Sequence, residues 1–197
     1  MTREREFAKS LLPPFFSMMK LIKNRLPPFS QIYQVMAVIA FMVYGWTITV
    51  FLYSFPSYIN FLTSGEIMTI FAYAMSAALI ESLMFMGLLL SVCLALPADA
   101  MRNAFITRGT CAAIVGIGSL MIYVFIFSQQ SFSLITQLPF WSLLGLALTI
   151  AFTYFSTRLR GVASAAAWVS DRLSIFPFLL IPLSLISILI VLYRHIF

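Results

Sequence analysis

Residues 109–157 read GTCAAIVGIGSLMIYVFIFSQQSFSLITQLPFWSLLGLALTIAFTYFST and contain no charged side chain. This stretch is too long for a single membrane-spanning helix, because about 20 apolar residues suffice to cross the roughly 30 Å of bilayer hydrocarbon. A more polar centre, residues 128–139, divides it into two apolar halves. The stretch therefore predicts two transmembrane helices joined by a short loop.

The rest of the chain has the same character. Hydrophobic residues make up 62% of the 197 residues and charged residues only 9%, whereas soluble domains average about 25% charged residues. Residues 26–65 and 173–193 are also free of charge, and 66–96 form a further long apolar run. We expect an all-α membrane protein with five transmembrane helices, at about 31–55, 66–96, 109–127, 140–156 and 173–193. Because the loops are short, residues 31–197 should form one bundle that follows a basic segment, residues 1–30.

The basic segment contains a second kind of helix. Pro-Pro pairs at residues 13–14 and 27–28 bracket a stretch whose apolar side chains recur at helical spacing, namely Phe15, Met19, Ile22 and Leu26. Lys20 lies on the opposite face and Lys23 at its flank. This pattern predicts an amphipathic helix over about 15–26 that lies in the membrane interface. Packing of the same helix on a partner protein is the alternative.

The distribution of basic residues predicts the orientation. Eleven of the twelve Lys and Arg residues fall in the N-terminal segment and in the second and fourth loops, and only Arg194 falls on the other side. Basic loops stay in the cytoplasm, so the N-terminus should be cytoplasmic and the C-terminus outside. The sequence carries no organellar or glycosylation motif, which favours a bacterial inner membrane.

The last predicted span contains two prolines, Pro177 and Pro182. Each proline removes a backbone hydrogen bond, so each is expected to bend the helix. The carbonyl groups freed near Leu173 and Phe178 would then need another donor inside the membrane.

Glu81 is the sharpest feature, because it falls at the middle of the second span. A charged residue at the bilayer centre costs at least about 2.5 kcal/mol. Ala74, Ala77 and Ala78 precede it by seven, four and three residues, and small side chains let another helix approach. We therefore expect Glu81 to point into the bundle, either neutral or in a polar environment. Four further side chains should lie at similar depth and form a midplane cluster with it: Tyr44, Ser119, Thr149 and Ser184.

The basic residues at the predicted cytoplasmic side are candidate contacts for anionic lipid headgroups. They are Lys20, Lys23, Arg25, Arg102, Arg108, Arg158 and Arg160. The alternative is that these charges only set the topology. The bilayer is thus the expected partner, together with other membrane subunits or a second copy of the chain. Nucleic acid is not expected, because no basic domain stands outside the membrane.

No catalytic, cofactor or metal motif is present. Cys93 and Cys111 have no further Cys or His nearby, as a zinc site would require, and His195 is the only histidine. The sequence favours a non-catalytic accessory or assembly subunit, or a scaffold, of a membrane complex. A small transporter or channel that uses Glu81 to bind a proton or substrate is the alternative. A lipid-modifying enzyme with Asp99 and Asp171 is the least favoured, since metal-dependent chemistry needs more converging carboxylates.

Overall fold

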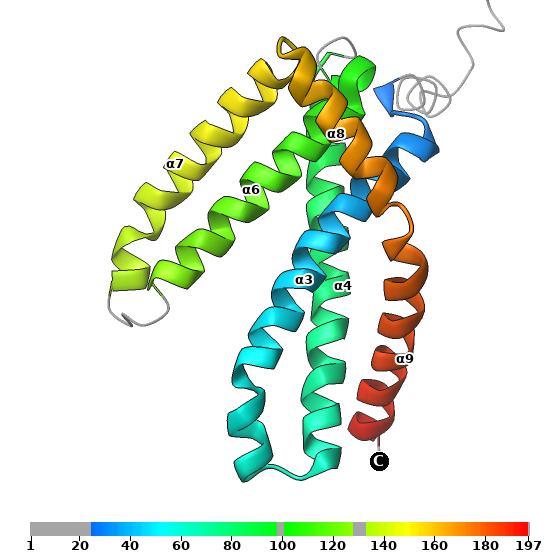
Figure 1. Cartoon of the computed structure of the whole chain (residues 1–197), viewed down its shortest axis with the longest axis vertical. Coiled ribbons are helices and arrows are strands. Elements are labelled where there is room, and N and C mark those ends of the chain that lie inside the picture. Colours follow the sequence, from blue (N-terminus) through cyan, green and yellow to red (C-terminus); the bar gives the residue numbers. More distant parts are fainter. Residues whose placement is uncertain (1–24, 98–100, 128–132, 197) are drawn as a thin grey trace, which may run out of the picture.

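The computed structural model describes residues 25–97, 101–127 and 133–196, and the side chains in these ranges except those of residues 133–137. Every regular element in the described ranges is a helix (Figure 1). The elements are α3 (Phe29–Phe61), α4 (Ser64–Ala95), the 3-10 helix η1 (Arg102–Ala104), α6 (Phe105–Phe127), α7 (Ser133–Ser156), α8 (Arg160–Leu173) and α9 (Phe176–Ile196). Five of them are long and apolar enough to cross a membrane, which confirms the predicted five-span, all-α fold. The predicted interfacial helix, about 15–26, lies outside the described residues except for Arg25 and Leu26.

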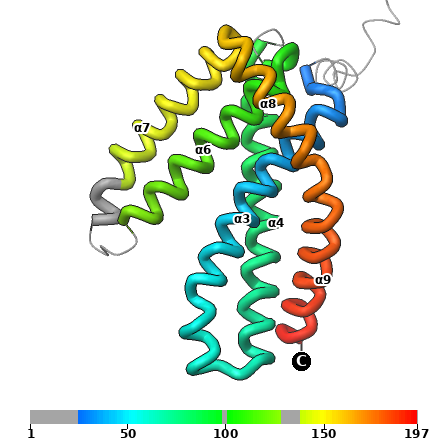
Figure 2. The backbone as a smooth tube through the Cα atoms, viewed as in Figure 1, coloured from blue at the N-terminus to red at the C-terminus, as the bar shows by residue number. Residues whose placement is uncertain are grey.

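The spans form two arms that diverge from a common end (Figure 1; Figure 2). Helices α3, α4 and α9 pack together as a three-helix arm, and α6 and α7 pack as an antiparallel two-helix arm. We call the common end the vertex: α3 and α6 begin there, α4 and α7 end there, and α8 crosses it. Helix α7 packs mainly on α6, so the two-helix arm is joined to the rest through α6 and α8.

The core lies in the vertex half of the molecule and is centred on α3. This helix packs against α4, α6, α8 and α9. Seven of its residues between Val35 and Tyr44 are buried, whereas none is buried from Gly45 to its end. Burial stops at this point because the two arms have separated and only α4 and α9 still cover α3.

Close contacts between helices stabilise the vertex. A Cβ atom at Gly109 of α6 would lie 3.1 Å from both Cγ atoms of Val35, so glycine permits this approach of α6 to α3. The Tyr33 hydroxyl donates to the Ser174 carbonyl at 3.0 Å and thereby ties α3 to the α8–α9 connection. Arg25 donates from Nη1 to the Leu94 carbonyl at 2.8 Å, one of the last carbonyl groups of α4, which have no partner within the helix.

The first loop is shorter than the sequence predicted. Helix α3 continues through Pro56 to Phe61, and only Leu62 and Thr63 separate it from α4. A proline removes one backbone donor, and here the helix continues on both sides of it. The Glu66 carboxylate accepts hydrogen bonds from the Thr63 backbone N–H and hydroxyl, both at 2.8 Å, and so caps the start of α4. At about 50 Å, α3 is longer than the hydrocarbon layer is thick.

The region before the last span also differs from the prediction. Residues 157–172 were expected to be a loop, but most of them form α8, and α9 begins only at Phe176. Pro177 therefore lies in the first turn of α9. Backbone N–H groups in the first turn have no acceptor within the helix, so a proline there removes no helical hydrogen bond. The predicted bend at Pro177 is wrong, and only Pro182 lies inside the helix.

Candidate functional site

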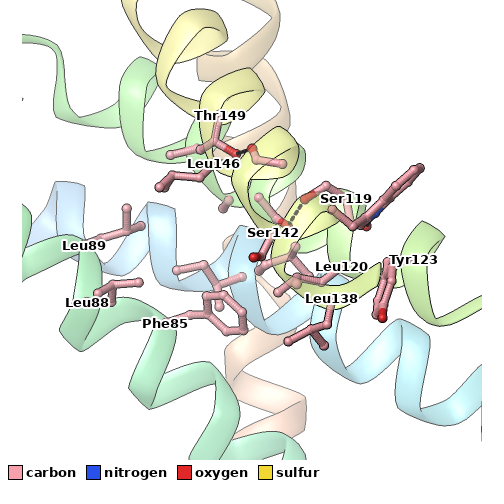
Figure 3. Close-up of a pocket in the computed structure, with 17 residues that line it drawn as sticks. Phe85, Leu88, Leu89, Ser119, Leu120, Tyr123, Leu138, Ser142, Leu146 and Thr149 are labelled. Carbon is pink, nitrogen blue, oxygen red and sulfur yellow. Dashed lines mark hydrogen bonds between the residues drawn. The ribbon is translucent and has the colours of Figure 1, made fainter. Parts of the chain in front are cut away.

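A cavity of about 240 Å³ lies where the two arms begin to separate (Figure 3). The three-helix arm contributes one wall, with Ile39 from α3 and Phe85, Leu88 and Leu89 from α4. The two-helix arm contributes the other wall, formed by residues spaced three or four apart on the facing sides of α6 and α7. Among the described residues, no charged side chain lines the cavity. We call this cavity the cleft.

Three of the polar side chains that line the cleft donate hydrogen bonds to helix carbonyl groups. Ser119 donates to the Gly116 carbonyl at 2.8 Å and Thr149 to the Gly145 carbonyl at 2.7 Å. The indole N–H of Trp141 donates to the Ser119 carbonyl at 3.3 Å. Because the donors of these side chains are used within the arm, the wall presents a mainly apolar surface to anything between the arms.

Small residues hold the two-helix arm together. A Cβ atom at Gly145 would lie 2.8 Å from the Ser119 hydroxyl oxygen, and one at Gly116 would lie 3.7 Å from Oγ1 of Thr149. Small side chains allow such close approach of membrane helices. Gly116 and Ser119 therefore serve a contact within the chain, between α6 and α7.

Glu81 is exposed on α4, so the expectation that it points into the bundle is wrong. It precedes Phe85 and Leu88 by four and seven residues, which places it on the same helix face as these cleft residues. It lies one turn farther from the vertex, where the arms are already apart. Within the described ranges its carboxylate has neither a hydrogen bond nor an ion pair. The preceding alanines did not predict its direction, because Ala78 is buried in the core whereas Ala77 is exposed.

The depth of Glu81 follows from the aromatic residues. Tyr53 on α3 and Tyr73 on α4 are both exposed. Tyr53 comes nine residues before the Leu62–Thr63 turn and Tyr73 ten residues after it, so the two rings lie at a similar height along the antiparallel helices. Exposed tyrosines are typical of the membrane interface. From Tyr73 to Ala95 the helix rises about 33 Å, close to the thickness of the hydrocarbon. A bilayer whose interface lies at Tyr73 would place Glu81 eight residues, or about 12 Å, inside the hydrocarbon.

The other members of the predicted midplane cluster fall into two groups. The Tyr44 hydroxyl and the Ser184 hydroxyl form a buried hydrogen bond between α3 and α9. Ser119 and Thr149 lie in the two-helix arm and line the cleft. The structure thus brings together Tyr44 with Ser184, and Ser119 with Thr149, while Glu81 stands apart from both pairs.

The predicted lipid-contacting residues have different environments. Lys20 and Lys23 lie outside the described residues. Arg25 is directed to the Leu94 carbonyl, and Arg102 and Arg108 are partly buried, Arg108 within 3.5 Å of the Thr157 hydroxyl. Arg158 and Arg160 are exposed beside α8. All the described arginines except Arg194 lie at the vertex.

Arg194 lies at the opposite end of the three-helix arm. Its Nη1 donates to the Thr69 hydroxyl at 2.6 Å, and Glu66 shares the same surface depression. This contact ties the end of α9 to the start of α4 beyond the level of Tyr73. In the parts of the chain that the structure describes, no three His, Cys, Asp or Glu side chains gather closely enough to hold a metal ion.

Sequence reasoning missed the cleft and α8. The cleft depends on the angle between the arms, which no local pattern in α4 or α6 encodes. Helix α8 did leave a signal, because Val162, Ala166, Val169 and Leu173 recur at helical spacing. Comparisons of the chain with protein families, with curated proteins and with solved structures find no match.

Proposed function

We propose that the chain is a non-catalytic subunit of a membrane complex, and that a transmembrane helix of a partner protein lies in its cleft beside Glu81. The observation that carries this proposal is the Glu81 carboxyl group, which is exposed on an apolar helix long enough to span a membrane and has no partner among the described residues. Acidic residues at this depth almost always face other protein or water. A partner helix in the cleft would remove Glu81 from lipid.

The partner should be a different protein that carries Lys, Arg or another hydrogen-bond donor at the depth of Glu81. Interactions of this kind between membrane helices contribute about 0.6–1.7 kcal/mol. A second copy of the chain would not supply a cation, because residues 26–101, 109–157 and 173–193 contain no Lys, Arg or His. Opposite charge therefore favours a heteromeric complex over a homodimer.

The shape of the molecule supports the same proposal. The two-helix arm stands away from the three-helix arm (Figure 1), and between residues 138 and 156 of α7 only Gly145 and Ser156 are buried. Both cleft walls are mainly apolar, and the wall formed by the two-helix arm contains small residues such as Ala112 and Gly116. Such surfaces suit another membrane helix, which associates through close packing rather than through hydrophobicity.

The proposed orientation places the vertex in the cytoplasm of a bacterial inner membrane and the C-terminus outside. Six described arginines lie at the vertex, Arg25, Arg102, Arg108, Arg158, Arg160 and Arg172. The opposite end carries Arg194. This asymmetry supports the orientation because basic residues are retained on the cytoplasmic side.

The experiment is purification of the tagged full-length chain in mild detergent, with mass measurement of the complex. We expect a stoichiometric foreign membrane protein, and Glu81→Ala should reduce the retained partner by about tenfold, which corresponds to about 1.4 kcal/mol. Leu83→Ala is the matched control, because Leu83 is exposed on the opposite side of α4. Equal retention by the Glu81→Ala variant and the control would contradict the proposal.

A small transporter that binds a proton or substrate at Glu81 is the second candidate, and the position of Glu81 next to the cavity favours it. A proton path through the cleft would require further titratable groups, and no acidic or basic side chain lines the described cavity. The test is reconstituted transport: Glu81→Gln should abolish it while the folded yield stays the same. Unchanged transport in this variant would exclude that role for Glu81.

A further inference from the structure

Helix α8 has one face against the bundle and one face exposed. Ala166 and Ser170 are buried at the vertex, where α8 packs across α3 and α6. Arg160, Ser164 and Trp168 lie on the exposed side. Because α8 crosses the cytoplasm-facing end proposed above, its exposed face lies at the level of the lipid headgroups.

Each end of α8 carries an arginine that stacks on an exposed aromatic ring. At the start, the guanidinium carbon of Arg158 lies 5.0 Å from the centroid of the Tyr154 ring, and its Nη2 donates to the Tyr154 hydroxyl at 2.9 Å. At the end, the guanidinium carbon of Arg172 lies 5.8 Å from the centroid of the Trp168 ring. Tyr154 and Trp168 are both exposed residues, with 56% and 63% of their surface accessible.

We propose that these two arginine–aromatic pairs bind the phosphate groups of anionic phospholipids, one at each end of α8. Tyrosine and tryptophan favour the headgroup level of a bilayer. A guanidinium that stacks on a ring keeps N–H groups at its edge, and these match the oxygens of a phosphate. Arg158 uses one donor on the Tyr154 hydroxyl, which leaves its other N–H groups for the phosphate. Arg160 adds a second exposed positive charge beside Arg158.

The two pairs form separate sites. Arg160 and Arg172 are twelve residues apart, which corresponds to about 18 Å along the helix, so one phosphate cannot reach both ends. The first site contains Arg158 and Arg160, and no acidic residue neighbours them in the sequence. The second site has Asp171 beside Arg172, so it should be the weaker of the two.

A lipid is favoured over free phosphate as the source of the anion. The exposed rings place both sites in the interface, where anionic headgroups are concentrated and basic residues are attracted to them. Free phosphate would gain nothing from the apolar part of Tyr154 or Trp168.

The experiment measures the relative association of spin-labelled phosphatidylglycerol and phosphatidylcholine with the full-length protein in liposomes. Arg158→Gln with Arg160→Gln tests the first site, Arg172→Gln tests the second, and Arg194→Gln at the other end is the matched control. We expect each vertex substitution to lower the preference for phosphatidylglycerol by up to about fivefold, with no change in the control. Arg172→Lys should lose part of the preference at the second site, because lysine keeps the charge without the planar guanidinium.

Two results would overturn the proposal. One is an unchanged preference in the vertex variants, or an equal decrease in the Arg194→Gln control, which would indicate that only the total charge matters. The other is displacement of phosphatidylglycerol by millimolar inorganic phosphate at constant ionic strength, which would identify free phosphate as the ligand.

Discussion

The buried hydrogen bond between Tyr44 and Ser184 predicts an asymmetric response to mutation. Both side chains are almost completely inaccessible, at 2% and 0% exposure, and their hydroxyl groups bond to each other between α3 and α9. Tyr44→Phe removes one hydroxyl, but Ser184 can turn to a carbonyl of its own helix. Neighbouring Ser187 already does so, donating to the Leu183 carbonyl at 2.9 Å. Ser184→Ala leaves the Tyr44 hydroxyl without that alternative.

The magnitudes follow from this difference. Tyr44→Phe should cost about 0.6 kcal/mol, the average for a hydrogen bond between membrane helices. Ser184→Ala should cost about 1–3 kcal/mol, because a buried polar group is left unsatisfied. The double variant should be more stable than Ser184→Ala alone, since Phe at position 44 removes the unsatisfied hydroxyl. A coupling energy of about 1 kcal/mol is expected from the complete cycle.

The assay is reversible unfolding of the full chain in mixed micelles, with the free energy measured for all four members of the cycle. Ser187→Ala is the matched control and should change stability little, because its hydroxyl bonds only within α9. Equal costs for the two single variants would refute the reasoning about Ser184. Strict additivity in the double variant would show that the two hydroxyl groups do not interact.

Two further predictions concern the two-helix arm and the orientation. Gly145→Ala should destabilise the packing of α6 on α7 by about 1 kcal/mol, because the new Cβ displaces the Ser119 hydroxyl. Thermal unfolding measures this loss of stability. Gly118→Ala is the control and should show no loss, because Gly118 has open space around it. Equal effects of the two substitutions would contradict the close contact. Cysteine introduced at exposed Ser57 should react with an impermeant maleimide in intact cells, whereas cysteine at exposed Ser164 should react only after permeabilisation. The reverse pattern would invert the proposed orientation.

The five spans were predictable because the bilayer sets one dominant constraint. A helix must be about 20 apolar residues long to cross it, and the charge-free stretches of this chain have that length or a multiple of it. Helix ends were less predictable. The first span was predicted to end at about residue 55, but Pro56 lies inside α3 and the helix continues to Phe61. Pro177 was expected to bend a helix and lies in the first turn of α9.

The candidate site was predictable only in part. The place of Glu81 within the second span follows from the length of the apolar run, and in the structure Glu81 lies inside α4, one of the five helices long and apolar enough to cross a membrane. Its direction does not, because alanines on neighbouring faces of α4 contact different surroundings: Ala78 faces the core and Ala77 is exposed. Helix α8 was missed because it is short and amphipathic, and the search for spans selects long apolar runs.

The most direct test of the account is photo-crosslinking in living cells from two positions on α4. Leu88 lines the cleft, and Leu83 is exposed on the opposite side. A photoreactive residue at position 88 is predicted to crosslink to a transmembrane segment of another protein that carries Lys, Arg or a polar donor. The yield of this adduct should fall by about tenfold when Glu81 is also changed to alanine. The same residue at position 83 should yield lipid adducts alone. Lipid adducts alone at both positions would contradict the claim that a partner helix occupies the cleft.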